Sequence, residues 1–215
     1  MHFIHNTQHN TTQHNTYEHI KFISTAPVDS NNDGGRDLIS SFIQGVISGL
    51  WASPKLLEQK LIALKKVKRD GSVDARPIIV GEALLRAAQK VALALVRDKV
   101  PALLCPLQVG VGVPNGVEKM VLAISKAKYV ESDDTHNAYN TVSRAAVMRE
   151  LIQKLPELAM MFQLVYGGTS NNYFCGHNVE CTGGVYQGDA MAPLYFALAL
   201  QPFLIEINDV PHRDQ

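Results

Sequence analysis

The 215-residue sequence has no long hydrophobic run, no paired cysteine motif and no excess of either charge. No stretch of eighteen or more uninterrupted apolar residues occurs, and the first residues lack the basic-then-apolar order of a secretion signal. Its three cysteines, Cys105, Cys175 and Cys181, are an odd number without Cys-x-x-Cys spacing, which argues against a disulfide framework or a zinc ribbon. We therefore expect a soluble, intracellular protein with ordinary thiols, in the nucleus or the cytoplasm.

The charge balance excludes a small, uniformly basic nucleic-acid-binding protein, because 20 basic residues face 20 acidic ones. The charges are nevertheless unevenly distributed. Residues 55–69 contain six lysines and arginines against the single acid Glu58. This local cationic stretch indicates either a solvated surface or a surface that binds an anionic partner.

The composition predicts a disordered leader followed by a folded domain. Residues 1–22 repeat His, Asn, Thr and Gln with few apolar residues, which is typical of a disordered leader, and we expect no metal site among their histidines. Residues 23–215 carry enough apolar side chains for one hydrophobic core, and we expect one domain or a large piece of one there.

The periodicity of apolar residues predicts a mixed α+β fold. A tight-turn signal at Asp70-Gly71 predicts a basic hairpin, a second hairpin is expected around Gly176, and a short strand is expected over residues 129–134. Helices are predicted at seven places, with Ser143 capping the fifth: residues 37–50, 54–64, 82–97, 117–126, 143–155, 156–166 and 193–207.

Two places could carry chemistry. Asp134 is the last residue of the short predicted strand and precedes a helix, where a carboxylate is a suitable magnesium ligand but needs a second carboxylate as a partner. An exposed or capping aspartate is the alternative. In residues 184–194, Gly188 permits close backbone approach and Asp189 precedes a helix, a pattern that also fits a plain loop-to-helix cap.

Four sequence motifs occur in an order that resembles the reverse transcriptases of non-LTR retrotransposons, from about Leu56 to Leu204. They are LIALKKVKRDGSVDARPIIVGEALLR, LQVGVGVPNG, DTHNAYNTVSR and CGHNVECTGGVYQGDAMAPLYFALALQPFL. The resemblance covers roughly two thirds of the chain. It implies that residues 23–215 form the fingers and part of the palm of a right-hand polymerase, with an incomplete palm sheet.

The resemblance also implies roles for single residues. Asp134 matches the first catalytic aspartate, which binds magnesium ions, and Ala138 and Tyr139 match the positions beneath the sugar of the incoming nucleotide. Lys68 and Arg76 match the fingers motif that grips triphosphate and template. Two further positions, Gln187 and Gly188, match the pair beside the nascent base pair. The implied partners are an RNA template, a DNA primer and deoxynucleoside triphosphates.

One motif of that family is absent. An aromatic-x-Asp-Asp hairpin, which supplies the other metal-binding carboxylate, should follow the last predicted helix, yet the sequence reaches Gln215 without it. A polar residue, Asp133, also stands where an apolar strand residue is expected. Because two-metal nucleotidyl transfer needs both carboxylate sources, we expect this isolated chain to be inactive. The alternatives are a non-catalytic nucleic-acid-binding remnant and a degenerate retroelement product.

Overall fold

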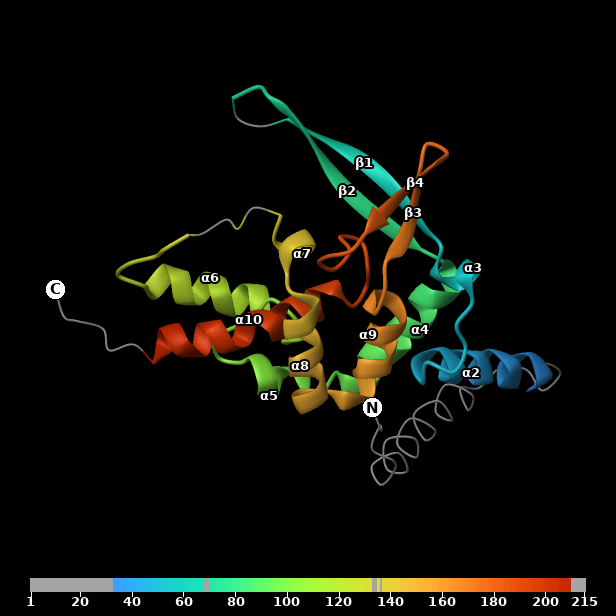
Figure 1. Cartoon of the computed structure of the whole chain (residues 1–215). Coiled ribbons are helices and arrows are strands. Elements are labelled where there is room, and N and C mark those ends of the chain that lie inside the picture. Colours follow the sequence, from blue (N-terminus) through green and yellow to red (C-terminus); the bar gives the residue numbers. More distant parts are fainter. Residues whose placement is uncertain (1–32, 68–69, 133–134, 136, 210–215) are drawn as a thin grey trace, which may run out of the picture.

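The structure, a computed structural model, describes residues 33–67, 70–132, 135 and 137–209 (Figure 1). The predicted leader, together with Lys68, Asp133 and Asp134, lies outside these residues. Helices and one four-stranded sheet make up the described part, so the mixed α+β class is confirmed. No helix in the described ranges has the length and apolar character to cross a membrane.

The sheet has the strand order β2-β1-β3-β4 and is built from two hairpins (Figure 1). Strands β1 (Gln59–Val67) and β2 (Val73–Gly81) pair antiparallel over their full length. Asp70 closes the turn between them, since its carboxylate accepts hydrogen bonds from the backbone and the hydroxyl of Ser72 at 2.9 and 2.7 Å. The hairpin predicted from Asp70-Gly71 is therefore confirmed.

The second predicted hairpin is also confirmed. Strands β3 (Ser170–Phe174) and β4 (His177–Cys181) pair antiparallel, and β3 pairs parallel with the first residues of β1. Only the base of this sheet joins the hydrophobic core, because both Gln59 and Asn172 are buried while most outer residues are exposed. The two hairpins thus project together from the helical part of the molecule (Figure 1).

The helices form the core beneath the sheet. The main ones are α2 (Asp33–Ile47), α4 (Ala83–Val96), α8 (Arg144–Lys154), α9 (Ala159–Tyr166) and α10 (Ala192–Asn208). Helix α2 packs on α4, and α8 packs on both α9 and α10. Fully buried large side chains at their contacts include Leu85, Leu151, Phe162, Tyr195 and Leu198.

Short helices complete the described part: α3 (Pro54–Leu57), α5 (Val100–Leu104), α7 (Ala138–Thr141) and the 3-10 turn η1 (Pro156–Leu158). The predicted cap at Ser143 is confirmed, because its hydroxyl accepts a hydrogen bond from the backbone N–H of Ala146 at 3.2 Å. Pro202 lies inside α10 without ending it. The helices predicted at 82–97, 143–155, 156–166 and 193–207 correspond to α4, α8, η1 with α9, and α10.

Two predicted elements are wrong. The helix expected over residues 54–64 ends at Leu57, because residues from Gln59 onward pair with β2 instead. The strand expected over 129–134 is not formed at residues 129–132, since no strand of the described part pairs with them. Tyr129 is 82% exposed there.

Helix α6 (Gly116–Lys126) was predicted, but it lies apart from the core. Every residue of it except Gly116 is exposed, including Val117, Met120 and Val121. Gly116 itself lies so close to the chain before it that an added Cβ would come 1.8 Å from the carbonyl oxygen of Val109.

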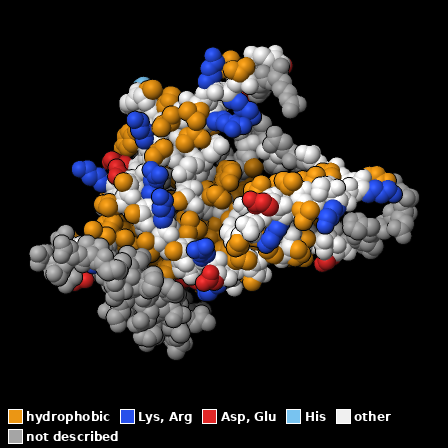
Figure 2. Space-filling model, turned by 180° about the vertical axis from the view of Figure 1, so that it is seen from behind, with side chains coloured by type: hydrophobic (Ala, Val, Ile, Leu, Met, Phe, Trp, Pro, Cys, Tyr) orange, Lys and Arg blue, Asp and Glu red, His pale blue; other side chains and the backbone are white. Residues whose placement is uncertain are grey.

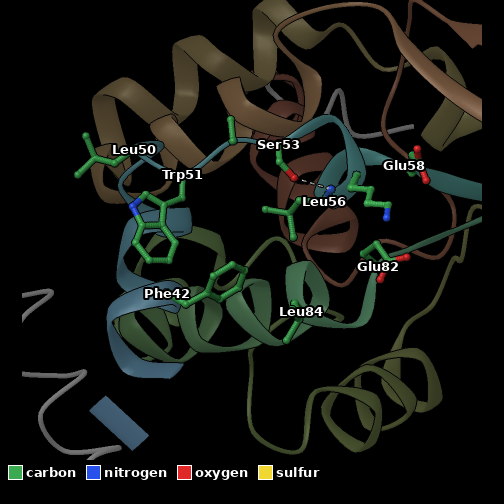
Figure 3. A pocket seen from close by; sticks show the side chains of 10 residues that line it. Phe42, Leu50, Trp51, Ser53, Leu56, Glu58, Glu82 and Leu84 are labelled. Carbon is green, nitrogen blue, oxygen red and sulfur yellow. Dashed lines mark hydrogen bonds between the residues drawn. The ribbon is translucent and has the colours of Figure 1, made fainter. Parts of the chain in front are cut away.

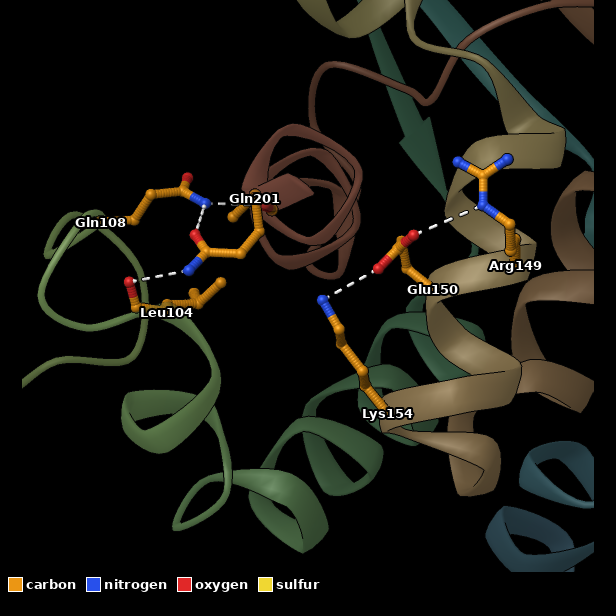
Figure 4. A network of polar contacts seen from close by, with 7 residues as sticks. Leu104, Gln108, Arg149, Glu150, Lys154 and Gln201 are labelled. Carbon is orange, nitrogen blue, oxygen red and sulfur yellow. Dashed lines mark hydrogen bonds and ion pairs between the residues drawn. The ribbon is translucent and has the colours of Figure 1, made fainter. Parts of the chain in front are cut away.

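A pair of glutamines connects the segment before α6 to α10 (Figure 4). The side-chain amide of Gln108 donates to the carbonyl of Ala197 at 2.8 Å and to Gln201 Oε1 at 2.7 Å. Gln201, which is buried, donates in turn to the carbonyl of Leu104 at 3.3 Å. These hydrogen bonds join the segment before α6 to α10, and the side-chain amides of both glutamines have acceptors.

Adjacent residues of α8 give a direct test of this core. Leu151 is fully buried, whereas its neighbour Ile152 is 60% exposed. We predict that Leu151→Ala lowers the free energy of unfolding by about 2–5 kcal/mol, because it leaves a cavity among packed helices. The matched control Ile152→Ala should change it by no more than about 0.5 kcal/mol. Urea denaturation measures both, and equal losses would contradict the packing described here.

Candidate functional site

Three segments that are far apart in sequence meet beside the outer edge of β2. The backbone N–H of Ile79 in β2 donates to the carbonyl of Gln187 at 2.8 Å, and that of Val185 donates to the carbonyl of Tyr139 at 2.7 Å. The loop of residues 182–191, which connects β4 to α10, therefore contacts both β2 and α7. Of the residues that the resemblance singles out, Gln187 and Gly188 lie against the strand that carries Arg76, and Ala138 and Tyr139 lie on α7, which the same loop contacts nearer its start.

Two glycines make this close approach possible. Gly188 has φ +118°, and an added Cβ would come 2.5 Å from the carbonyl oxygen of Ile79. Gly184, with φ +64°, is buried against α7, where a Cβ would come 2.3 Å from the backbone of Asn140. The expectation that Gly188 permits a close backbone approach is confirmed, and its partner is β2.

The side chains at the junction differ in exposure. Tyr139 is partly buried, and its ring lies 5.3 Å from that of Phe196 in α10. Burial raises the pKa of its hydroxyl above the ordinary value, so Tyr139 is a neutral aromatic surface near neutral pH. Arg76, in contrast, is exposed on β2 opposite Leu64. No carboxylate of the described residues forms an ion pair with its guanidinium.

Arg144, at the start of α8, holds the loop in place and is a residue that sequence reasoning missed. Its guanidinium donates to the carbonyls of Gly184, Tyr166 and Gly168 at 2.8, 3.2 and 3.0 Å. It also lies over the rings of Tyr166 and Tyr186, at 5.4 and 6.0 Å. This role could not be predicted from the sequence, because the carbonyls, rings and thiol that the guanidinium contacts belong to segments distant along the chain.

Asp189 fixes the other end of the loop. Its carboxylate accepts hydrogen bonds from the hydroxyl of Tyr166 and from the backbone N–H of Met191, the latter at 2.8 Å. The hydroxyl of Tyr166 in turn accepts from the N–H of Tyr186 at 3.2 Å. The cap expected at Asp189 thus exists, but it also joins the loop to α9.

Burial sets the ionisation of this pair. Desolvation raises the pKa of the Asp189 carboxyl above its ordinary value. The hydrogen bonds to the carboxylate act in the opposite direction, but their effect is smaller. Desolvation, followed by the charge of Asp189, raises the pKa of Tyr166 well above its ordinary value. Tyr166 is therefore a neutral donor, and the Asp189 carboxyl, with its raised pKa, keeps its proton to a higher pH than an ordinary aspartate does.

The described residues do not by themselves fit a metal site, since they contain no group of three or more His, Cys, Asp and Glu side chains that could hold a metal ion. The expected ligand, Asp134, lies outside them, as does the expected phosphate contact Lys68. Within the described part, the segments that meet at the junction thus carry a guanidinium on β2, an aromatic ring on α7 and backbone groups of the loop, rather than a set of carboxylates.

A separate groove of about 740 Å³ lies between α2, α3 and the start of α4 (Figure 3). Phe42 and Trp51 line it on one side, with their rings 5.6 Å apart, and Glu58 and Glu82 lie on the other. None of the residues that the resemblance singles out lines this groove.

No protein-family model matches the chain, and no curated protein is significantly similar to it.

The titration of Asp189 gives a testable pH dependence. A carboxyl whose pKa is higher in the folded state than in the unfolded state stabilises the fold at low pH, and that contribution is lost as pH rises from about 4 through the raised pKa. We predict that Asp189→Asn removes this loss, so that the variant gains stability relative to wild type as pH rises. Urea denaturation from pH 4 to 8 measures this difference. The exposed Asp98→Asn is the control, and parallel pH profiles for Asp189→Asn and wild type would contradict the assignment.

Proposed function

We propose that the chain forms the fingers and the front part of the palm of an RNA-directed DNA polymerase of the non-LTR retrotransposon type. The observation that carries this proposal is the junction at β2. The order of the motifs alone does not require Arg76, Tyr139 and Gln187 to lie on segments in contact. A template-directed polymerase needs such a meeting point, because phosphate, sugar and base of one nucleotide must be held together.

Each part of the junction suits one part of a nucleotide. The exposed guanidinium of Arg76 is a fork of donors that matches phosphate oxygens. Tyr139, braced by Phe196, offers a fixed ring edge against which a sugar can rest and a 2′-hydroxyl can clash. The Gln187–Gly188 backbone lies directly against β2, where a Cβ at Gly188 would come 2.5 Å from the carbonyl oxygen of Ile79, and this contact would hold Gln187 beside the nascent base pair.

Magnesium would be held by Asp134 together with a second carboxylate source, and it would supply electrostatic stabilisation to the phosphoryl transfer. The 215 residues contain no aromatic-x-Asp-Asp sequence to serve as that second source. The residues of this chain would position the nucleotide and template, while the missing carboxylates must come from further polypeptide. The isolated chain is therefore a binding unit rather than a complete catalyst.

A second candidate, a non-catalytic nucleic-acid-binding protein, is favoured by one observation. Lys60, Lys65 and Lys66 belong to β1 of the projecting hairpin, and within the described residues none of them forms an ion pair. Figure 2 shows Lys and Arg side chains on the surface of the molecule seen from behind. Free cationic side chains on a projecting hairpin suit phosphate binding with or without catalysis. Catalytic activity in a longer protein distinguishes the two functions.

The decisive experiment is primer extension on an RNA template with magnesium, using this chain and a version extended through any downstream coding sequence that carries an aromatic-x-Asp-Asp motif. We predict no extension by the 215-residue chain and extension by the longer one, reduced to background by Asp134→Asn. In the longer version, Arg76→Ala should raise the KM for nucleotide about tenfold or more, by loss of a charge-assisted contact. The exposed α4 residue Arg86, changed to Ala, serves as the control.

Extension by the short chain would show that the absent carboxylates are dispensable. Full activity of the longer protein with Asp134→Asn would contradict the polymerase proposal. RNA binding without extension by any version would favour the non-catalytic alternative.

A further inference from the structure

One face of the four-stranded sheet is turned away from the core. Side chains alternate between the two faces of a strand, so Gln59 and Lys60 of β1 point to opposite sides. Gln59 pairs with Asn172 of β3, and both are buried against the helices. Lys60 pairs with Tyr173, and both are exposed, so the Lys60 side is the solvent face of the sheet.

The solvent face combines an aromatic ring with apolar side chains. Tyr173 is 47% exposed in β3, and on β1 the residues two and four beyond Lys60, Ile62 and Leu64, are 36% and 50% exposed. A tyrosine this exposed, set on a rigid strand beside other apolar residues, is available as a flat surface on which an aromatic ligand can stack.

Cationic side chains lie along the same face. Lys60 is the neighbour of Tyr173, and Lys66 lies farther out on the same side of β1. Arg76 of β2 pairs with Leu64, which places it about 13 Å along β1 from Lys60 at roughly 3.3 Å per residue. In the part of the chain that the structure describes, no carboxylate forms an ion pair with these three side chains.

Two acidic residues limit the basic surface. Asp74 of β2 lies opposite Lys66 on this face, so its carboxylate offsets the charge of Lys66 at the outer end. Glu180 of β4 shares the face of Tyr173, because its partner on β3, Asn171, is two residues from Tyr173. A phosphate chain would be repelled there and attracted toward β1 and β2. The charges thus favour an anionic strand that runs along β1 from Tyr173 as far as Arg76, and neither across β4 nor farther out past Asp74.

We propose that this solvent face binds single-stranded nucleic acid, with one unpaired base stacked on Tyr173 and phosphates held by Lys60 and Arg76. A base inside a duplex has both of its faces covered, so a ring exposed on a sheet selects unpaired bases. The inference rests on the proposed function for the identity of the strand, which would be the RNA template ahead of the junction at β2.

The test is the fluorescence anisotropy of a labelled twelve-nucleotide oligouridylate titrated with the full chain. Tyr173→Ala and Tyr173→Leu should each weaken binding about tenfold, which is within the range for loss of one stacked base, while Tyr173→Phe should bind like wild type. The matched control is Phe174→Ala, because Phe174 is the next residue of β3, points to the opposite face and is 36% exposed.

Salt dependence tests the phosphate contacts separately. Lys60→Gln should lower the slope of log affinity against log salt by about 0.7, the value for one contact to a single strand. Lys119→Gln, on the exposed helix α6, should leave the slope unchanged. Glu180→Gln should tighten binding, because it removes a carboxylate from the same face.

Absence of oligouridylate binding, equal losses for Tyr173→Ala and Phe174→Ala, or wild-type binding by Tyr173→Leu would overturn the proposal. Thermal unfolding of each variant separates lost binding from lost folding, and Tyr173→Phe keeps the comparison valid if Tyr173→Ala is unstable. If Tyr173 is needed for binding but the longer protein never extends a primer, the binding face stands and the polymerase function is refuted. If the longer protein extends a primer and Tyr173→Leu does not change the rate, the polymerase function stands and the binding face is refuted.

Discussion

The hydrogen bond from the Ile79 N–H to the carbonyl of Gln187 positions the rest of the candidate site. Strand β2 lies at the edge of the sheet, so its outward N–H groups lack a strand partner. The loop before α10 supplies an acceptor for one of them. Through this contact the projecting hairpin, which carries the cationic residues, is connected to the loop that also contacts α7.

The remaining interactions at the junction keep that loop in reach of β2. Arg144 binds the carbonyl of Gly184 at one end, and Asp189 accepts from Tyr166 and Met191 at the other. Between these two anchors Gly188 allows the backbones to approach. Separating the Arg144 guanidinium from its carbonyls would leave unpaired polar groups, and so would separating the Asp189 carboxylate from its donors. Both steps therefore cost free energy. The loop is thereby held in one conformation by two helices, α8 and α9.

Much of the local structure could be predicted from the sequence because it depends on neighbours along the chain. Ser143 signals a helix start, Asp70-Gly71 signals a turn, and the spacing of apolar residues marks α4. The helix expected at 54–64 was wrong because pairing with β2 outweighed the local pattern from Gln59 onward. The strand expected at 129–132 was wrong because a strand needs a partner that the local sequence does not reveal.

The candidate site was predictable only in part, for the same reason. Gly188 was expected to allow a close approach, but its partner Ile79 could not be named from spacing. Arg144 and Tyr166 gave no signal, since their roles depend on contacts with residues distant in sequence. The resemblance identified positions along the chain, and in the structure the segments that carry the described ones contact one another through the loop of residues 182–191.

The most direct test of this account is hydrogen exchange at the amide of Ile79, measured in wild type and in Gly188→Ala. The account predicts that the Ile79 amide exchanges slowly in wild type, although it lies on the outer edge of the sheet, and quickly in Gly188→Ala, where the added methyl group forces the loop from β2. The amide of Leu151 in α8 should stay protected in both. Fast exchange at Ile79 in the wild-type protein, or equal protection in the two proteins, would contradict the junction on which the proposed function rests.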